Sequence, residues 1–225
     1  MISILLPTYN GDKYIDQTVQ SILNQTCRDF ELLVGLNGGS PDATLEKLSE
    51  FSDKRIKIFN YTHKGKPKTL NLLLDESLYE IIALIDDDDL WHAKKLETQL
   101  KLTETYDVVG SQILYIDEKG AYPTKIGWGP KLSTDSDIIH KLMLSYENHI
   151  ANSAALIKKE SIINVGGWNE SLPALEDMDL WIRMLNNGCK FTNMSYTLMY
   201  HRIHKTSNFN SKKWDPEELL GYTKE

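Results

Sequence analysis

Cysteine is scarce in this sequence. Its 225 residues include two cysteines, Cys27 and Cys189, which lie far apart and in no metal-ligand spacing. A framework of several disulfides is therefore excluded, and a pair of reduced thiols is typical of a cytosolic protein. We expect a cytoplasmic location, and peripheral association with a membrane, through a partner or another segment, stays open.

Long hydrophobic runs and an excess of basic residues are also lacking. No apolar stretch reaches the roughly 20 residues that a transmembrane helix needs, so we expect no transmembrane segment. The first residues carry no basic region and only a short apolar run, which argues against a signal peptide. Lysine and arginine number 25 against 32 aspartates and glutamates, a formal net charge of −7. This balance argues against a nucleic-acid partner and against a polybasic membrane anchor.

What the sequence does contain is a regular alternation in its first half. Short apolar segments typical of buried strands alternate with segments whose apolar residues recur at helical spacing, such as Ile15, Val19 and Ile22. The predicted strands are residues 2–6, 31–36, 56–61 and 81–85. Strand and helix in turn predict βαβ units with right-handed crossovers. We therefore predict an α/β fold of Rossmann-like type, with a mostly parallel sheet flanked by helices.

The second half is less regular, and we predict it as a smaller mixed region. Helices are predicted over 94–105, 135–145 and 177–187, strands over 107–116, 152–157 and 191–200, and a loop over 118–134. We expect Ser40 to cap the second helix, Pro41 to occupy its first position, and residues 201–205 to form a tail. No change of composition marks a linker, so we predict a single domain over residues 1–225.

An acidic run follows the fourth predicted strand. Asp86, Asp87, Asp88 and Asp89 come directly after the buried segment 81–85. Alternate side chains of a strand point to opposite faces, so Asp86 and Asp88 can converge beyond the strand end, or Asp87 and Asp89 in the other register. Adjacent carboxylates repel one another unless a cation lies among them, and Mg²⁺ or Mn²⁺ accepts such oxygen ligands. A solvated acidic turn is the alternative.

Five blocks, in order, resemble the family-2 glycosyltransferases of the GT-A fold, and the resemblance runs from Ile2 to about Ser207. The blocks are residues 7–10 with 14–15 and 21–26, the acidic run within 84–91, the glycine turn 166–168, the acidic helix start 176–183, and the late basic block 200–204. The resemblance implies that residues 1–106 bind a nucleotide sugar, and that residues 107–225 bind the acceptor and form a C-terminal tail.

The resemblance also implies a reaction. It is the metal-dependent, inverting transfer of a sugar from a nucleoside-diphosphate sugar to a hydroxyl of a glycan, glycolipid or glycoprotein, as in polysaccharide biosynthesis. Asp88 is the implied metal ligand, for Mn²⁺ or Mg²⁺, and His204 either adds an imidazole from the tail or is a surface histidine. Asp177 is the implied general base, since a carboxylate at a helix start stays ionised and a single base opposite the leaving group gives inversion.

The remaining candidate residues would bind substrate, with core packing as the equal alternative for Trp168, a half-buried aromatic for Tyr9, and solvated charge for Arg202 and Lys68. They are Pro7, Thr8, Tyr9, Asn37, Lys68, Asp86, Asp87, Trp168, Glu176 and Arg202. Two positions depart from the family pattern: Leu36-Asn37 replaces a pair of adjacent aspartates near the nucleotide base, and Leu70-Asn71 replaces an arginine-asparagine pair. An asparagine amide both donates and accepts hydrogen bonds, so Asn37 can still read a base edge. We expect a UDP-sugar first, with GDP- and dTDP-sugars as alternatives.

The sequence has three alternative interpretations. A sugar nucleotidyltransferase would want an arginine in the loop after the first strand, and residues 7–11 contain none. A phosphatase built on paired aspartates would carry them after the first strand rather than the fourth. A catalytically inactive nucleotide-sugar-binding module is supported only by the change at Leu36-Asn37.

Overall fold

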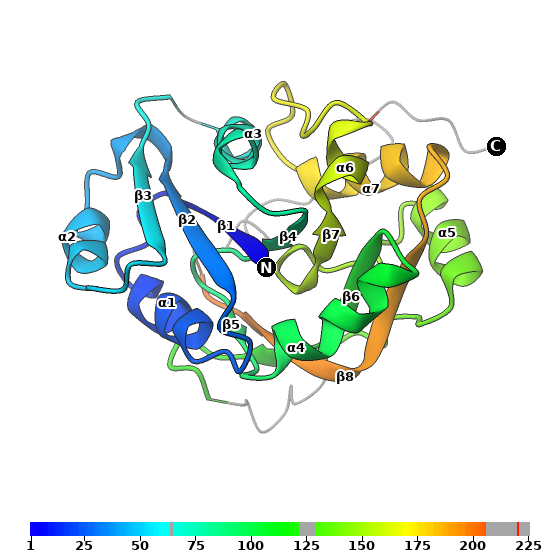
Figure 1. The fold of residues 1–225 in the computed structure, drawn as a ribbon, viewed down its shortest axis with the longest axis horizontal. Helices are drawn as coiled ribbons and strands as arrows, with labels where there is room; N and C mark the ends of the chain where they lie inside the picture. The colour runs from blue at the N-terminus through cyan, green and yellow to red at the C-terminus, as the bar shows by residue number, and fades with distance from the viewer. Residues whose placement is uncertain (64, 122–128, 206–219, 221–225) are drawn as a thin grey trace.

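The computed structural model describes residues 1–63, 65–121, 129–205 and 220. Through these residues runs one sheet, in the strand order β3-β2-β1-β4-β7-β6-β8-β5 (Figure 1). Its strands are β1 (Ile2–Thr8), β2 (Phe30–Leu36), β3 (Ile56–Asn60), β4 (Ile81–Leu84), β5 (Leu90–Trp91), β6 (Val108–Ile116), β7 (Leu156–Lys158) and β8 (Phe191–Arg202).

The first four strands form the parallel part of the sheet. β1 lies between β2 and β4, with Ile2 aligned to Phe30 on one side and to Ile81 on the other. β3 adds to the outer side of β2 in the same direction. The predicted βαβ order is therefore confirmed. The carboxyl ends of these strands meet at one edge, which is where open α/β sheets bind their ligands.

The second half turns the sheet into a mixed one. β7 runs antiparallel between β4 and β6, β8 runs parallel to β6, and β5 closes the far edge antiparallel to β8. Only residues 85–89 separate β4 from β5 along the chain, although three strands lie between them in the sheet. So short a connection can bridge them only because the sheet curls, as Figure 1 shows.

Helices cover both faces of this curled sheet (Figure 1). They are α1 (Ile15–Leu23), α2 (Thr44–Ser49), α3 (Lys66–Glu76), α4 (Lys95–Leu100), α5 (Ser136–Leu144), α6 (Lys159–Ile163) and α7 (Glu176–Asn186), with 3₁₀ turns at Asn37–Gly39, Lys101–Glu104 and Asn152–Ala154. Side chains of β1 alternate between two buried clusters. Ile4 and Leu6 pack with α1, α2 and α4, and Leu5 packs with α3, α5, α6 and α7. Both faces of the central strand are thus buried, as its continuous apolar run predicts.

Some local predictions are wrong. The strand predicted over 152–157 begins as a 3₁₀ turn, and only its last two residues belong to β7. Ser40 does not cap α2, whose N-cap is Ala43, because its hydroxyl instead accepts a hydrogen bond from the Asn10 amide, and Pro41 lies outside that helix. β8 runs through Arg202, so His201 and Arg202 belong to the sheet rather than to a tail. The two-residue strand β5 was not predicted, since so short a strand leaves no periodic signal.

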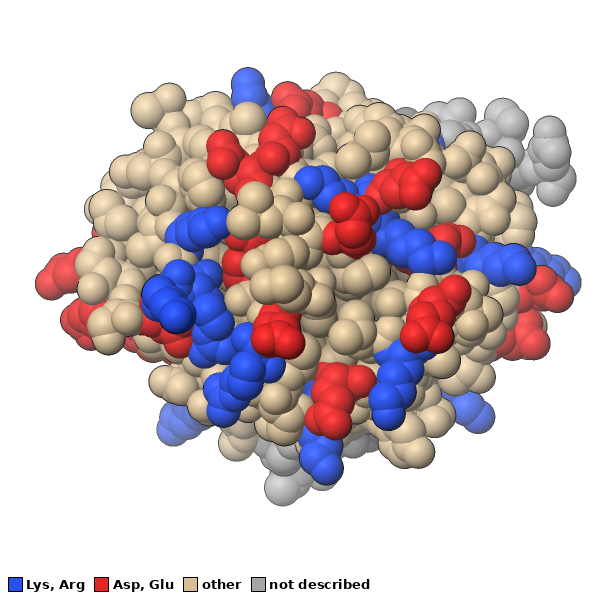
Figure 2. Space-filling model, in the orientation of Figure 1, with Lys and Arg blue, Asp and Glu red and all other residues tan. Residues whose placement is uncertain are grey.

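The face of the molecule drawn in Figure 2 shows no large segregation of charge. Lysine and arginine side chains lie beside aspartate and glutamate over much of the face in Figure 2. In the part of the chain that the structure describes, no helix has both the length and the apolar character to cross a membrane.

Candidate functional site

The acidic run 86–89 lies at the carboxyl ends of the parallel strands, the edge of the sheet where a ligand is predicted to bind. β4 ends at Leu84, and the loop that follows packs against the end of β1, where the Thr8 hydroxyl donates a hydrogen bond to Oδ2 of Asp87. A Cβ at Gly11 would collide with both of these side chains, so only glycine lets the loop after β1 approach so closely. Burial, followed by the charge of Asp88, raises the pKa of Asp87 to about 7.

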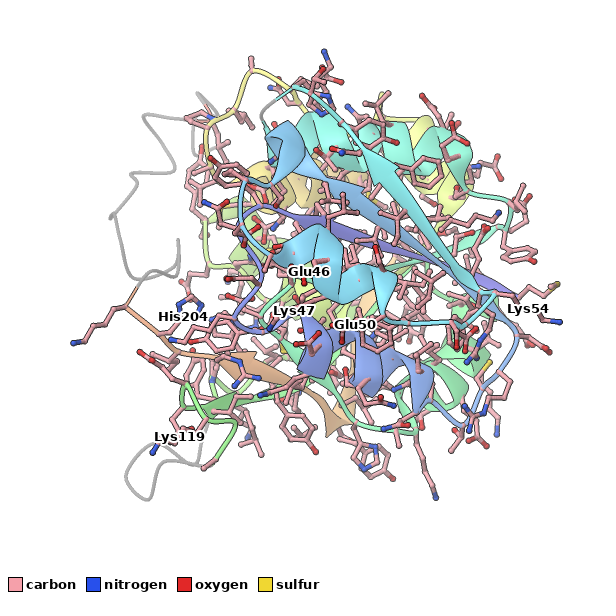
Figure 3. The ribbon with its side chains drawn as sticks, turned by 90° about the vertical axis from the view of Figure 1, so that its left-hand side faces the viewer. Glu46, Lys47, Glu50, Lys54, Lys119 and His204 are labelled. Carbon is pink, nitrogen blue, oxygen red and sulfur yellow. The ribbon has the colours of Figure 1, made fainter. Side chains whose placement is uncertain are left out.

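Asp88 meets the late basic block. Nε2 of His204 lies 2.8 Å from Oδ2 of Asp88, and the two side chains are 9% and 18% exposed. Burial and the neighbouring charges of Asp89 and Asp86 raise the pKa of Asp88 to about 6, while His204 acts in the opposite direction. The structure therefore brings together the two residues that were predicted as metal ligands. Figure 3 places His204 and Lys54 at opposite ends of the molecule.

Asp89 connects the acidic loop to the end of β8. It is 1% exposed, and its Oδ1 lies 3.1 Å from Nδ1 of His201 and 3.0 Å from the backbone nitrogen of Arg202. Burial disfavours a charged imidazole, but the carboxylate of Asp89 outweighs it and raises the pKa of His201 to about 9. Asp87 thus faces Thr8 and Asp89 faces His201, so these two carboxylates do not converge on one point.

Lys66 joins the acidic run to the start of α7, and sequence reasoning missed it. Its Nζ lies 2.6 Å from Oδ1 of Asp86 and 3.0 Å from Oε1 of Glu176. Lys68, the lysine that was predicted to bind substrate, is exposed. The useful signal was Gly65-Lys66-Pro67: proline favours the first turn of a helix, which places Lys66 at the helix start and therefore at the ligand edge.

Asp177 lies in the first turn of α7. Its Oδ2 accepts a hydrogen bond from Nδ2 of Asn148 at 3.1 Å, and its Oδ1 accepts one from the amide of Met178 at 2.8 Å. Burial, followed by the adjacent charge of Glu176, raises the pKa of Asp177 to about 6, and Lys66 offsets part of that rise. A carboxyl with this pKa is a stronger base than an ordinary aspartate and is still mostly ionised at neutral pH.

The residues predicted to hold the nucleotide lie at successive strand ends. Tyr9 follows β1 and is 44% exposed, and Asn37 follows β2. Oδ1 of Asn37 accepts a hydrogen bond from the amide of Gly65 at 2.8 Å. Pro7 is buried within β1 opposite Gly35, so only its backbone remains for a ligand.

Two predicted substrate residues are core residues instead. Trp168 is 2% exposed, and the side chain of Asn71 holds both its amide and its carbonyl, so it offers no platform to a sugar. Arg202 is fully buried. Its guanidinium donates to the carbonyls of Asp88, Asp117 and Glu118 and to the side chain of Gln17. It is therefore not available to a diphosphate.

The described residues do not by themselves complete a metal site. No group of three histidine, cysteine, aspartate or glutamate side chains is arranged there to hold an ion. Asp88 and His204 supply one carboxylate and one imidazole, a donor pair that suits a divalent cation whose other ligands come from a bound molecule and water.

Solved structures share this fold. The structure of S. aureus TarS 1–349 in complex with UDP-GlcNAc superposes with a TM-score of 0.79 at 19% identity, over 97% of this chain and 63% of that one. The mannosyltransferase PcManGT from Pyrobaculum calidifontis, in complex with GDP-Man and Mn²⁺, gives a TM-score of 0.69 at 18% identity, over 91% of this chain and 57% of that one. Our chain thus spans less than two thirds of these two proteins, and the likeness establishes its GT-A fold.

Sequence relatives carry the comparison further. The O-antigen biosynthesis glycosyltransferase WbnJ of Escherichia coli is 32% identical over 221 residues, covering 94% of this chain and 83% of that protein. The UDP-Glc:alpha-D-GlcNAc-diphosphoundecaprenol beta-1,3-glucosyltransferase WfaP of Escherichia coli is 30% identical over 210 residues, covering 92% and 79%. The model of glycosyl transferase family 2 matches residues 3–165. With an acidic loop at the ligand edge of a GT-A sheet, the chain belongs to glycosyl transferase family 2 and is a glycosyltransferase.

Proposed function

We propose that this glycosyltransferase is metal-dependent and inverting, and that it moves a sugar from a nucleoside-diphosphate sugar to a hydroxyl of a glycan, glycolipid or glycoprotein. The observation that carries the proposal is the position of Lys66, which holds Asp86 of the donor-side loop 2.6 Å away and Glu176, the neighbour of Asp177, 3.0 Å away. This position supports the proposal, because it brings the residue proposed as the base and the loop proposed to bind the metal to one edge of the sheet.

The metal would be held by Asp88 and His204. Their carboxylate and imidazole fit Mn²⁺ and Mg²⁺, and the diphosphate oxygens of the donor would add the ligands that the protein does not supply. When bound, the cation offsets the negative charge that gathers on the leaving diphosphate. Asp86 would contact the ribose or the water around the metal, and Asp87 would hold the loop in place through Thr8.

The donor would lie along the strand ends. Tyr9 would flank the nucleotide base, and Asn37 would face its edge. A UDP-sugar is our first candidate, because WfaP is named for UDP-Glc and TarS was solved with UDP-GlcNAc, and a GDP-sugar is the second, because PcManGT was solved with GDP-Man. A dTDP-sugar stays a candidate, since Asn37 can pair with several bases. Residues 1–106 would form this donor half of one domain, and residues 107–225 its acceptor half.

The chemistry would be a direct displacement. The acceptor hydroxyl oxygen forms a bond to the anomeric carbon while the bond from that carbon to the diphosphate oxygen breaks, and the hydroxyl proton passes to a carboxylate oxygen of Asp177. Attack from the face opposite the leaving group inverts the anomeric centre. The hydrogen bond from Asn148 orients the base for this transfer.

The acceptor would be a precursor of a surface polysaccharide. WbnJ is named for O-antigen biosynthesis, and the name of WfaP specifies a diphosphoundecaprenol-linked sugar. By this analogy the chain would work in the cytoplasm, next to a membrane that carries its acceptor.

Calorimetric titration would test the donor site. UDP, GDP, CDP and dTDP would each be added with Mn²⁺ and with a chelator, to the wild type and to Asp88→Ala. We expect one nucleotide to bind in a metal-dependent way and to lose that binding in the variant. Once the donor sugar is identified, the anomeric configuration of the product, read by NMR, would report inversion. Binding that is insensitive to both chelator and Asp88→Ala would overturn the metal-dependent mechanism.

A further inference from the structure

Lys66 connects two parts of the chain that carry different tasks in the proposed reaction. It is the first residue of α3, and its side chain is 31% exposed. One partner, Asp86, belongs to the loop after β4, and the other, Glu176, is the first residue of α7. The lysine therefore fixes the distance between the donor-side loop and the helix that carries Asp177.

The backbone next to Lys66 is bound by Asn37, the residue that is proposed to face the nucleotide base. Gly65 precedes it with φ 128°, a backbone conformation that other residues rarely adopt, and its amide donates to Oδ1 of Asn37. Pro67 follows, and its ring restricts the first turn of α3. Asn37, Gly65 and Lys66 thus form a continuous path from the end of β2 to Glu176.

Asp177 is surrounded by charges of both signs. The described groups that act on it are Glu176 from its own helix, Asp86 from the loop after β4, and Lys66 from α3, while the neutral amide of Asn148 binds its Oδ2. Lys66 lies between Asp86 and Glu176 and forms an ion pair with each of them. Two like charges near a base would keep it protonated unless a cation compensates them.

We propose that Lys66 is a positioning residue of the transfer reaction, which holds the start of α7 against the donor-side loop and keeps Asp177 ionised for proton abstraction. This inference rests on the proposed role of Asp177 as the base. Consistent with it, Lys66 acts to lower the pKa of Asp177, while burial and Glu176 act to raise it.

An NMR titration of the Asp177 carboxyl carbon tests the inference without any substrate. The signal would be assigned by its loss in Asp177→Asn. In Lys66→Met, which has no cation, we expect Asp177 to titrate at higher pH than in the wild type. In Lys66→Arg, which keeps the charge, we expect a smaller shift. In Glu176→Gln we expect a shift to lower pH, because the nearest like charge is removed. The matched control is Lys54→Met, an exposed lysine at the far end of the molecule (Figure 3), which should leave the titration unchanged.

Kinetics would link that titration to the reaction. With saturating donor and Mn²⁺, we expect the acid limb of kcat against pH to move upward in Lys66→Met and to return toward the wild type in Lys66→Arg. If the Asp177 titration is unchanged in a folded Lys66→Met, or if activity falls equally at every pH, the inference is overturned. If the titration moves but no nucleotide sugar supports transfer by the wild type, the proposed function fails instead.

Discussion

Nε2 of His204 lies 2.8 Å from Oδ2 of Asp88, although 116 residues of sequence separate them. The contact exists because β8 runs along β6 to its last residue, Arg202, and delivers the next residues of the chain to the loop after β4. The ring of Tyr14 packs against the imidazole, with centroids 5.0 Å apart, and fixes its orientation. In the proposed metal site, this carboxylate and this imidazole would supply two of the ligands.

Replacement of His204 by alanine should weaken the binding of Mn²⁺ together with the nucleotide. We expect a loss of roughly ten- to a hundredfold in affinity, the range for losing a group that ligates or orients a metal ligand. Calorimetry with the nucleotide at fixed Mn²⁺ would measure it. His140→Ala, an exposed histidine on α5, is the matched control and should bind as the wild type does. Equal affinities in all three proteins would remove His204 from the metal site.

The rate of transfer should depend on the ionisation of Asp177. Because its pKa is raised to about 6, the base is protonated and inactive below that pH and ionised above it. We therefore expect kcat to rise with pH up to about 6 and then to level off. Asp177→Asn should lower kcat by about 10²–10⁴-fold, the usual contribution of a general base, without weakening donor binding. Asp75→Asn on α3 is exposed and serves as the control. A variant with wild-type kcat would show that another group takes the proton.

The parallel half of the fold was predictable because its signals are local. The apolar run 81–85 and the acids that follow it are adjacent in the sequence. Together they predict the edge of the sheet at which a ligand binds, without knowledge of any other segment. Lys66 was missed for the opposite reason. Three lysines, at 64, 66 and 68, alternate in the sequence, and only the tertiary structure shows that residue 66 faces Asp86 and Glu176 while residue 68 is exposed.

The errors at Arg202 and Trp168 have a common cause. Lone basic and aromatic residues near a motif look available for ligands, but both side chains also suit a buried role when partners exist. Besides the side chain of Gln17, the partners of the Arg202 guanidinium are the backbone carbonyls of residues 88, 117 and 118, and backbone groups leave no trace in the sequence. Their positions depend on how β6 and β8 pair, which is a long-range property.

Alanine at Gly65 should impair transfer more than alanine at Gly166. Both glycines have positive φ, 128° and 81°, and a Cβ at either position would meet nothing within 4 Å, so the direct cost in each case is backbone strain. We expect each change to destabilise the fold by about 1–3 kcal/mol. Only Gly65 carries the amide that binds Asn37 and precedes Lys66. Thermal unfolding and kcat measured on both variants would test this, and an equal loss of kcat would contradict the importance of the segment that positions Lys66.

Arg202 should be required for the stability of the fold. We do not expect its charge to bind the donor directly. Its guanidinium is buried, lies over the ring of Tyr14 with 4.6 Å to the centroid, and donates to the carbonyl of Asp88 in the acidic loop and to that of Asp117 after β6. Arg202→Met would remove the side-chain donor to the carbonyls of Asp88 and Glu118, while the carbonyl of Asp117 keeps the amide of Gly120. We therefore expect a loss in the free energy of unfolding of about 1–3 kcal/mol for each buried carbonyl that is left unpaired. Arg202→Lys should recover only part of it, because an ammonium cannot reproduce the fork of the guanidinium.

Urea unfolding of both Arg202 variants would measure this loss, and Arg28→Lys, at an exposed arginine that donates to the carbonyl of Leu23, is the matched control. An arginine that bound the diphosphate would behave differently. Its replacement would leave the urea midpoint of unfolding near that of the wild type and would weaken nucleotide binding. Because the Arg202 guanidinium is fully buried and donates to the carbonyls of residues 88, 117 and 118 and to Gln17, we expect the midpoint to fall first, and metal-dependent nucleotide binding to fall only as the loop that holds Asp88 loosens.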